Sequence, residues 1–381
     1  MIFSSADIRV IEHALDNGRY NEDYCVTEIL SESTTFHHVK PIPCAPLPRQ
    51  FGFWFHIGPG FAPLESSTYH HNLLSADNVK LLGQDGIPVF RNGWVDSTSL
   101  NYCREDLPGC QFQRTEDRLR IAVSDRVLRG KYFLGFNAGY SNYAHWLTDQ
   151  LPLLWHYRQA YMDKDVGLLL PRDLPTFAQN YIAMIGIPKS AVTLIGDEVV
   201  DIDTLLFGTA FSFDAIPNSV VNLLKSFRES LTLTDLPRRK GIYISRRDTT
   251  IRTLLNEKAV CALMQQAGFD IIVPGEMSVQ AQIDAFYRAD IVIGCHGAGM
   301  ANIIYCKPGT RVLELFPEYT VSAHFWMLAS YFDLRYGAIF GTSFDQDRAF
   351  EDQAGSWDAP FVVQEDALIE YLRAADDGDP L

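Results

Sequence analysis

At 381 residues, 47% of them hydrophobic, the chain is long enough to bury more than one apolar core, and typical domain sizes predict two domains. Its formal net charge of −15 argues against nucleic acid or an anionic membrane as the main partner, because both attract basic surfaces. Seven cysteines without a CxxC pair disfavour a disulfide framework and a zinc ribbon, so we expect reduced, mostly structural thiols.

The beginning of the chain shows no export or membrane signal. Charged residues, among them Asp7, Arg9 and Glu12, interrupt the apolar run that a signal peptide would need. No later segment approaches the ~18 uninterrupted apolar residues of a transmembrane helix. We therefore expect a cytoplasmic protein without a transmembrane segment.

The N-terminal half begins irregularly and then alternates strands with helices. Residues 1–65 are rich in polar and turn residues and predict a connector or arm, and residues 79–127 predict short strands and loops. Apolar runs predict strands at 132–135, 166–170, 192–194 and 204–207, with helices at 142–160 and 175–186. This alternation favours a parallel sheet.

A polar stretch at 232–240 predicts a linker, so we expect an N-terminal, acceptor-side domain at 1–235 and a C-terminal domain at 236–381. The second part predicts strands at 241–245, 270–273, 291–294 and 312–316, with helices at 257–267 and 278–288 between them. Short loops join these elements, as in a doubly wound α/β unit.

A glycine-rich turn is the most informative segment. Residues 289–302 form an apolar strand that runs through this turn into a helix. Gly294, Gly297 and Gly299 allow a ligand to approach the backbone closely, and N–H groups at the helix start favour an anion. His296 and Asn302 add side-chain donors, which suits a diphosphate. An ordinary strand-to-helix turn is the alternative explanation of the glycine spacing alone.

A basic cluster follows an earlier strand of the same predicted sheet. Its members are Ser245, Arg246, Arg247, Asp248, Arg252, Asn256 and Glu257. Ligands of open α/β sheets bind at the carboxyl ends of strands, where Ser245, Arg246 and His296 would converge. An arginine fork fits phosphate oxygens, so we assign Arg246 to phosphate binding and leave Arg247 and Asp248 to a solvated surface.

Glu314 places a carboxylate inside the apolar strand 312–316. A carboxylate there is costly unless it is paired or meets a ligand hydroxyl, and a ribose diol is a suitable partner. The alternative is an edge residue that faces solvent.

Together these residues resemble glycosyltransferase family 61. The resemblance is carried by Tyr243, Ser245, Arg246, Arg247, Asp248, Arg252, Asn256, Glu257, Gly268, Phe269, Gln282, Ala289, Asp290, the run 294–302, Pro308, Gly309 and Glu314. It is dense over 241–317, and 142–152 is similar to an aromatic helix of the family with His, Asp and Pro. The first 130 residues show no such resemblance.

The resemblance implies a GT-B architecture: two Rossmann-like, doubly wound domains that face each other across a cleft, with the C-terminal one holding a nucleotide sugar. It implies inverting transfer to a glycan hydroxyl, without metal or cofactor, in the synthesis of a capsular or other surface polysaccharide. Members often use UDP-sugars. The expected donor-binding residues are Ser245, Arg246, Arg252, Asn256, Glu257, His296, Gly297, Gly299, Asn302 and Glu314. Glu314 would hold the ribose, and the glycine turn with Arg246 would hold the diphosphate.

Catalysis requires a base for the acceptor hydroxyl and positive charge for the departing diphosphate. His145 and Asp149 are candidates for the base because residues four apart share one face of a helix. Which of the two is the base stays open. The alternative is a buried histidine bonded to Asp149 for structural reasons.

Other readings compete with a transferase. Asp201 and Asp203 imitate a metal-binding carboxylate pair, but solvent-facing positions on a strand explain them better. A hydrolase would use Cys295 or a serine as nucleophile on the strand-to-helix turn, yet Cys295 and His296 stand between the glycines where Gly-x-Ser-x-Gly would be needed. A dinucleotide oxidoreductase fits the glycines and Glu314 but leaves the arginine cluster unexplained. A non-catalytic nucleotide-sugar or glycan-binding module of the same fold is a further alternative.

Overall fold

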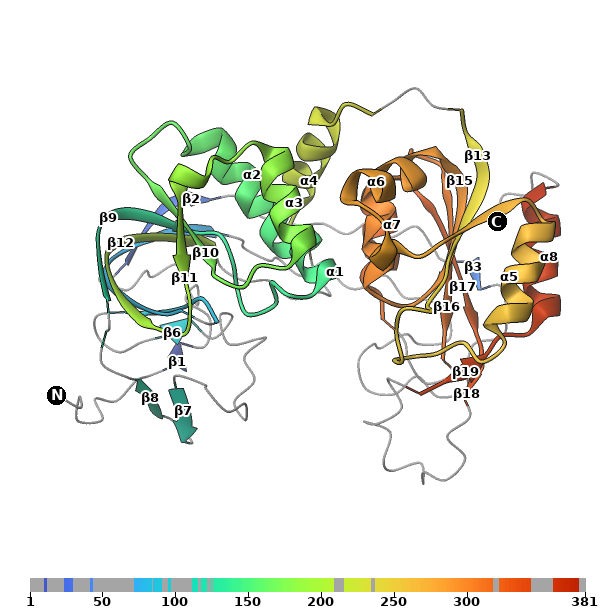
Figure 1. Cartoon of the computed structure of the whole chain (residues 1–381), viewed down its shortest axis with the longest axis horizontal. Coiled ribbons are helices and arrows are strands. Elements are labelled where there is room, and N and C mark those ends of the chain that lie inside the picture. Colours follow the sequence, from blue (N-terminus) through green and yellow to red (C-terminus); the bar gives the residue numbers. More distant parts are fainter. Residues whose placement is uncertain are drawn as a thin grey trace. The chain divides into compact units, whose positions relative to one another are not determined.

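The computed structural model in Figure 1 describes residues 10–11, 24–29, 42–43, 72–83, 85–90, 95–96, 112–115, 118–121, 124, 126–208, 216–233, 237–317, 322–343 and 359–376. Contacts divide the chain into two compact units, Met1–Thr35 with Ser67–Phe227, and Phe36–Ser66 with Arg228–Leu381. This division falls after Phe227, and the domain boundary expected near residue 236 stays a prediction. Most of the expected arm at 1–65 lies outside the described residues.

The second unit is built on a six-stranded parallel sheet. Its strands are β13 (Arg239–Ile244), β14 (Phe269–Ile272), β15 (Ala289–Cys295), β16 (Arg311–Phe316), β17 (Arg335–Phe340) and β3 (Ile42–Pro43). Their order is β14-β13-β15-β16-β17-β3, and every neighbouring pair is parallel. The chain leaves β13 toward one edge through β14 and then returns to its other side with β15. The order of the sheet therefore reverses between β13 and β15.

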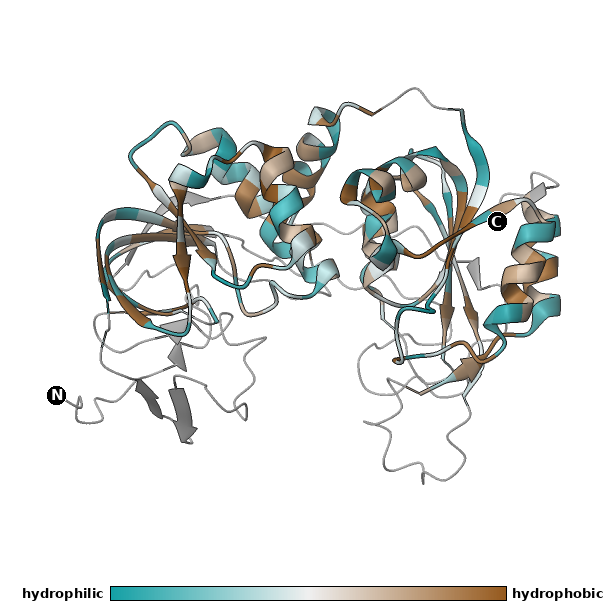
Figure 2. Ribbon diagram, in the orientation of Figure 1, coloured by the Kyte–Doolittle hydropathy of each residue, from teal (hydrophilic) through white to brown (hydrophobic). Residues whose placement is uncertain are grey.

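Helices cover both faces of this sheet (Figure 1). On one face lie α5 (Glu257–Gln266) and α8 (Glu365–Asp376); on the other lie α6 (Val279–Arg288), the 3-10 helix η6 (Ala298–Tyr305) and α7 (His324–Tyr331). Tyr243, Val260, Leu313 and Leu368 belong to one apolar core between the sheet and the first pair of helices. The predicted doubly wound unit is confirmed here, and Figure 2 shows the hydrophobic strands between helices of mixed polarity.

Smaller elements complete the second unit. They are the 3-10 turn η5 (Pro274–Glu276) and the short antiparallel pair β18 (Thr342–Ser343) and β19 (Phe361–Val362). Phe361 also bonds through its backbone to the loop before α5, from Leu255 N at 2.8 Å. The C-terminal segment is thereby tied to the loop that follows the basic cluster.

The first unit holds a nine-stranded mixed sheet. A continuous parallel part is formed by β12 (Val199–Gly208), β9 (Arg126–Leu134), β10 (Gly167–Pro171) and β11 (Val192–Ile195). On the other side of β12 follow β4 (Asn72–Leu82), β5 (Ile87–Val89), β6 (Val95–Asp96) and β1 (Val10–Ile11), and β2 (Tyr24–Ile29) also pairs with β4. Because β4 runs antiparallel to β12, the expectation of a parallel sheet is right only for part of this unit.

Helices and one separate hairpin make up the rest of the first unit. The helical segments are α1 (Tyr143–His145), the π-helix η3 (Trp146–Gln150), α2 (Leu151–Ala160), α3 (Thr176–Ile185), η4 (Lys189–Ala191) and α4 (Asn218–Ser230), and the hairpin is β7 (Phe112–Thr115) with β8 (Arg118–Ile121). Trp155 of α2 and Tyr181 of α3 both contact the ring of Phe227 in α4. These three helices thus share one aromatic core.

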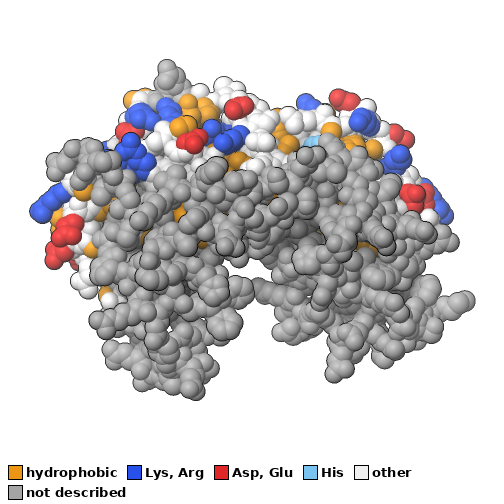
Figure 3. Space-filling view, turned by 180° about the vertical axis from the view of Figure 1, so that it is seen from behind, with side chains coloured by type: hydrophobic (Ala, Val, Ile, Leu, Met, Phe, Trp, Pro, Cys, Tyr) orange, Lys and Arg blue, Asp and Glu red, His pale blue; other side chains and the backbone are white. Residues whose placement is uncertain are grey.

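The surface carries charges of both signs. On the face shown in Figure 3, basic and acidic side chains lie intermixed over the described residues. Within the described part of the chain, no helix combines the length and the apolar character that crossing a membrane would require.

Candidate functional site

The basic cluster and the glycine turn meet at the reversal point of the parallel sheet. Ile244 at the end of β13 pairs with Gly294 of β15, so Ser245 and His296 follow two adjacent strands at the same edge. Backbone bonds fix both exits: Ser245 N donates to Ile272 O at 2.9 Å, and His296 N donates to Leu315 O at 2.9 Å. Ligands of open α/β sheets bind at this kind of reversal point.

Two arginine side chains converge on one carbonyl oxygen of the turn. Arg246 Nη1 donates to His296 O at 3.1 Å, and Arg252 Nε donates to the same oxygen at 3.2 Å. Arg246 Nη2 also donates to Ile251 O at 2.6 Å, while its Nε is buried without a hydrogen-bond partner among the described residues. Two guanidinium groups this close repel each other unless an anion lies nearby, so the arrangement favours an anionic ligand.

Gly297 makes the close approach of Arg246 possible. A Cβ atom at position 297 would lie 1.9 Å from Arg246 Nη1, which is far inside van der Waals contact. The backbone of Gly297 is extended, so any residue could adopt its dihedral angles. The glycine is therefore needed for space, and η6 begins directly after it at Ala298.

Glu257 and Asn256, both predicted to bind the sugar nucleotide, form hydrogen bonds next to the basic cluster. Glu257, at the start of α5, accepts a hydrogen bond from Arg246 N at 2.7 Å and one from the Tyr243 hydroxyl at 3.4 Å. Asn256 bonds in both directions with the backbone of Val363, through Nδ2 at 2.9 Å and Oδ1 at 3.3 Å. Glu257 thus holds the backbone at Arg246, whereas Asn256 ties the start of α5 to the backbone of Val363. Contact of either side chain with the sugar nucleotide stays a prediction.

Two other residues predicted to bind the sugar nucleotide are buried: Ser245 bonds within the basic cluster, and Asn302 bonds to the glycine turn. Ser245 is 4% exposed, and its hydroxyl accepts from Arg247 N at 3.3 Å. Asn302 is fully buried and donates to Gln282 Oε1 at 2.9 Å and to Gly299 O at 3.1 Å. Asn302 therefore lies on the protein side of the turn and holds the backbone at Gly299. Its direct contact with the sugar nucleotide stays a prediction.

Glu314 is completely buried and bonded to protein groups. Its Oε1 lies 2.5 Å from His296 Nδ1, and its Oε2 accepts from the Tyr336 hydroxyl at 2.5 Å. Burial, together with the neighbouring Glu314 carboxylate, raises the pKa of Tyr336 well above its usual range, so the phenol keeps its proton and donates. The alternative that Glu314 is an edge residue facing solvent is therefore wrong. The partners that a carboxylate in this strand was predicted to need are the His296 ring and the Tyr336 hydroxyl.

Arg247 and Asp248 lie on the surface, as expected. Both side chains are exposed, and Arg247 forms an ion pair with Glu276. A pair of this kind contributes little stability, because solvent screens it. Of the two neighbouring arginines, Arg246 therefore faces the turn and Arg247 faces solvent.

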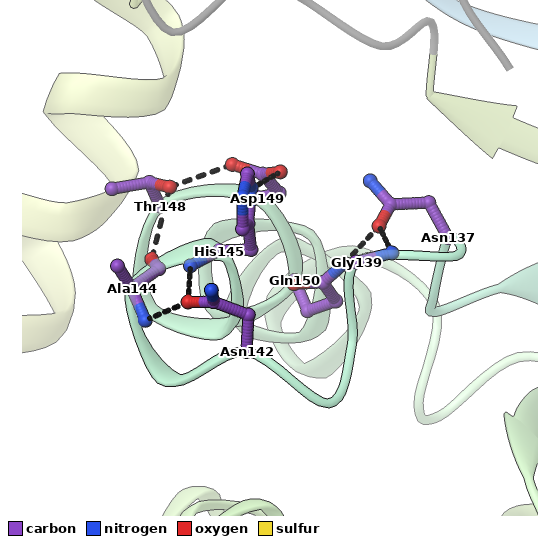
Figure 4. A network of polar contacts seen from close by, with 8 residues as sticks. All are labelled: Asn137, Gly139, Asn142, Ala144, His145, Thr148, Asp149 and Gln150. Carbon is purple, nitrogen blue, oxygen red and sulfur yellow. Dashed lines mark hydrogen bonds and ion pairs between the residues drawn. The ribbon is translucent and has the colours of Figure 1, made fainter. Parts of the chain in front are cut away.

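The second predicted site lies in the first unit, with His145 at the end of α1 and Asp149 on the π-helical segment η3 (Figure 4). His145 Nδ1 lies 3.3 Å from Asp149 Oδ2, and the two side chains are 15% and 7% exposed. Asn142 begins the helix by accepting from Ala144 N at 2.9 Å, which matches a polar residue at an N-cap. Single π-helical turns are frequent at functional sites, and here the turn carries Asp149.

Thr148 completes the contacts of Asp149. Its hydroxyl lies 2.6 Å from Asp149 Oδ1 and 3.1 Å from Ala144 O, inside the protein. On the other side of the helix, Gln150 donates to Asn137 Oδ1 at 2.5 Å (Figure 4). The helix therefore presents an imidazole and a carboxylate as a bonded pair, with the carboxylate also held by a hydroxyl.

The residues that would support the competing readings are buried or ion-paired. Cys295 is 2% exposed, and burial raises the pKa of its thiol to about 12, which opposes a nucleophilic thiolate. Asp201 pairs with Lys80 at 2.5 Å, and Asp203 accepts from Arg129 at 2.9 Å. These carboxylates serve ion pairs on β12. Within the described residues, no group of three or more His, Cys, Asp or Glu side chains could hold a metal ion.

Sequence reasoning missed the roles of Tyr336, Thr148 and Gln282. Tyr336 lies on β17, which was not predicted, and its hydroxyl reaches a residue 22 positions earlier. Thr148 sits next to Asp149 in the sequence, so a hydroxyl beside a candidate base was a usable signal. Gln282 was among the residues that carry the family resemblance, but its contact with Asn302 depends on how α6 packs against η6.

Comparison with known proteins identifies the central region. Residues 143–313 match the family model described as Glycosyltransferase 61. Over 63 residues, the chain is 35% identical to the beta-1,2-xylosyltransferase RCN11 of Oryza sativa subsp. japonica and 33% identical to a beta-1,2-xylosyltransferase of Arabidopsis thaliana. Each match covers 16% of this chain and 12% of the relative. The family-model match runs from the start of α1, which carries His145, into β16, and it ends one residue before Glu314.

Proposed function

We propose, from the premise that residues 143–313 belong to glycosyltransferase family 61, that the chain transfers a sugar from a nucleoside diphosphate to a glycan hydroxyl. One observation carries this proposal: Arg246 and Arg252 converge on the carbonyl of His296 at the reversal point of a parallel sheet. In a chain of net charge −15, such a local basic site suits an anion that the rest of the surface would repel.

The diphosphate would bind at the glycine turn. Arg246 and Arg252 would neutralise its oxygens, and N–H groups at the start of η6 would add donors. As the bond between sugar and diphosphate breaks, negative charge grows on the departing phosphate oxygen, and fixed positive groups there lower the barrier. This chemistry requires no metal ion, and we include metal independence in the proposal.

The acceptor side would be served by the helix with His145 and Asp149. A base removes the proton from the acceptor hydroxyl while that oxygen attacks the anomeric carbon. His145 is the more exposed member of the pair, so we propose it as the base and Asp149 as the group that orients its ring. Direct attack of this kind inverts the configuration at the anomeric carbon.

The finer features of the proposal come from the family. They are a GT-B architecture, a UDP-sugar as donor, a capsular or other surface polysaccharide as product and a cytoplasmic location. The names of the two plant relatives make xylose a specific candidate for the transferred sugar. A nucleotide-sugar-binding module without turnover is the outcome that would replace the enzyme.

The test is a calorimetric screen of the purified protein against UDP, UDP-xylose, GDP, CMP, ADP and NAD, with and without EDTA. We expect one nucleoside diphosphate to bind regardless of chelator. Arg246→Ala should weaken that binding roughly 10- to 100-fold, because a charge-assisted hydrogen bond contributes about 1.5–3 kcal/mol. Arg247→Ala is the matched control and should change it by less than about twofold, since its ion pair lies on the surface.

Binding of NAD alone would replace the transferase with an oxidoreductase. Binding of a nucleoside diphosphate without transfer of a sugar to any glycan acceptor would indicate the non-catalytic binding module. Equal affinities of the wild type and Arg246→Ala would remove Arg246 from the diphosphate site.

A further inference from the structure

The contact between Glu314 and the His296 ring bears on the charge that the protein presents to the diphosphate. Glu314 has no exposed surface, and its contacts with the His296 ring and the Tyr336 hydroxyl use both carboxylate oxygens. A ribose hydroxyl could reach this carboxylate only if the surrounding side chains moved. The buried carboxylate therefore acts on the site through the histidine that it contacts.

The burial of Glu314 requires that its carboxylate be paired. Tyr336 is a neutral donor, so it stabilises the carboxylate of Glu314 without balancing its charge. A buried carboxylate is tolerated when a cation pairs with it. His296 Nδ1, 2.5 Å from Glu314, belongs to the contacting group that can become a cation, and a protonated ring would make the pair neutral as a whole.

The aromatic surroundings of His296 favour the same state. Its ring stacks on Phe316 with centroids 5.2 Å apart and an angle of 19° between the planes, and Phe325 contacts it at 5.4 Å. The face of an aromatic ring attracts a cation. Arg246 and Arg252 oppose a protonated ring, but they approach His296 through its backbone carbonyl, whereas Glu314 contacts the ring itself.

We propose that Glu314 is a positioning residue that holds His296 as an imidazolium, so that its Nε2–H is a charged donor for the diphosphate. This inference rests on the proposed function for the identity of the ligand. Glu314 thereby contributes to leaving-group stabilisation without touching the nucleotide, and the ribose is held by other groups.

The first experiment needs no nucleotide. Protein labelled with ¹⁵N-histidine is examined by NMR at pH 7.5, and His296→Gln identifies the ring signals of His296. We expect the imidazolium pattern in the wild type and a neutral ring in Glu314→Gln. Glu276→Gln, which removes an exposed carboxylate of the same unit, should leave the His296 signals unchanged. A neutral His296 ring in the wild type overturns the proposal whatever the protein binds.

The second experiment separates the ribose role from the positioning role. Affinities for UDP and 2′-deoxy-UDP are measured for the wild type, Glu314→Gln and Glu276→Gln. We expect Glu314→Gln to weaken both ligands by the same factor, roughly tenfold or more, because a charged donor becomes a neutral one. If Glu314→Gln weakens UDP alone and abolishes the preference over 2′-deoxy-UDP, Glu314 binds the ribose and the proposal is wrong.

The two experiments fail in different ways. If the wild type binds no nucleoside diphosphate, the proposed function is wrong. The NMR signals of the His296 ring still decide, in that case, whether Glu314 holds it as an imidazolium. A charged ring together with equal weakening of both ligands supports the function and the inference together.

Discussion

Arg246 Nη1 occupies the space in which a side chain at position 297 would begin, 1.9 Å from the Cβ atom that an alanine would carry there. In Gly297→Ala the guanidinium must move, and its bond to the His296 carbonyl is lost. Because the backbone at 297 is extended, we expect the fold to persist and affinity for a nucleoside diphosphate to fall about tenfold or more. Calorimetry and the melting temperature report the two quantities separately.

The control for this substitution is the double variant. In Arg246→Ala the space beside Gly297 is vacant, so adding Gly297→Ala should have little further effect on affinity. Residues in direct contact show this kind of non-additivity. Additive losses would mean that the alanine disturbs the turn itself.

We predict that His145→Ala and Asp149→Asn leave donor affinity nearly unchanged and lower kcat by about 10²- to 10⁴-fold, the usual range for general acid–base catalysis. The reason is that both side chains belong to the first unit, whereas the groups assigned to the donor belong to the second. Steady-state kinetics combined with donor calorimetry measures both effects. Full activity of both variants would move the base to another residue.

Thr148 tests the proton arrangement around Asp149. A hydroxyl has one proton, and Thr148 Oγ1 lies within bonding distance of two acceptors, Asp149 Oδ1 and Ala144 O. It can donate to Asp149 when the carboxylate is charged, or turn to Ala144 O when Asp149 carries a proton. We expect Thr148→Val to lower kcat with an altered pH profile, and Thr148→Ser to retain both. Identical kinetics of the valine and serine variants would contradict this role.

Cys295 gives a prediction at alkaline pH. Burial raises the pKa of its thiol to about 12, whereas an unfolded cysteine titrates near pH ~8.5. Above pH ~8.5 the unfolded chain loses this proton and the folded chain keeps it, so the folded state loses relative stability as pH rises. Cys295→Ala should show a shallower fall of melting temperature between pH 8.5 and 10.5. Slopes that match within error would show that the thiol ionises alike in both states.

The second unit was the more predictable part of the chain. Strands of a parallel sheet are buried on both faces and read as continuous apolar runs, which is why 241–245, 291–294 and 312–316 were found near their observed bounds. The sheet of the first unit was harder, because the pairing of β4 with β12 joins residues more than a hundred positions apart. No local pattern specifies whether such a pair is parallel.

The site was predictable in its residue types and less so in its contacts. A carboxylate within the run 312–316 signalled that Glu314 needs a partner, yet the sequence could not show that His296 and Tyr336 supply it. Asn302 was expected to face the ligand, and its position behind the turn follows from the packing of η6 against α6. The π-helical turn at Asp149 depends on which carbonyl each N–H selects, and residue spacing does not encode that choice.

The strand β3 determines how a C-terminal fragment of the chain should behave. Ile42 and Pro43 pair with Gly337 and Ala338, so the edge of the C-terminal sheet is supplied by a segment nearly three hundred residues earlier in the chain. A fragment that starts at 236 would leave the outer edge of β17 without this partner. Exposed sheet edges recruit other chains, so such a fragment should self-associate, and supplying residues 36–66 as a separate peptide should suppress that association.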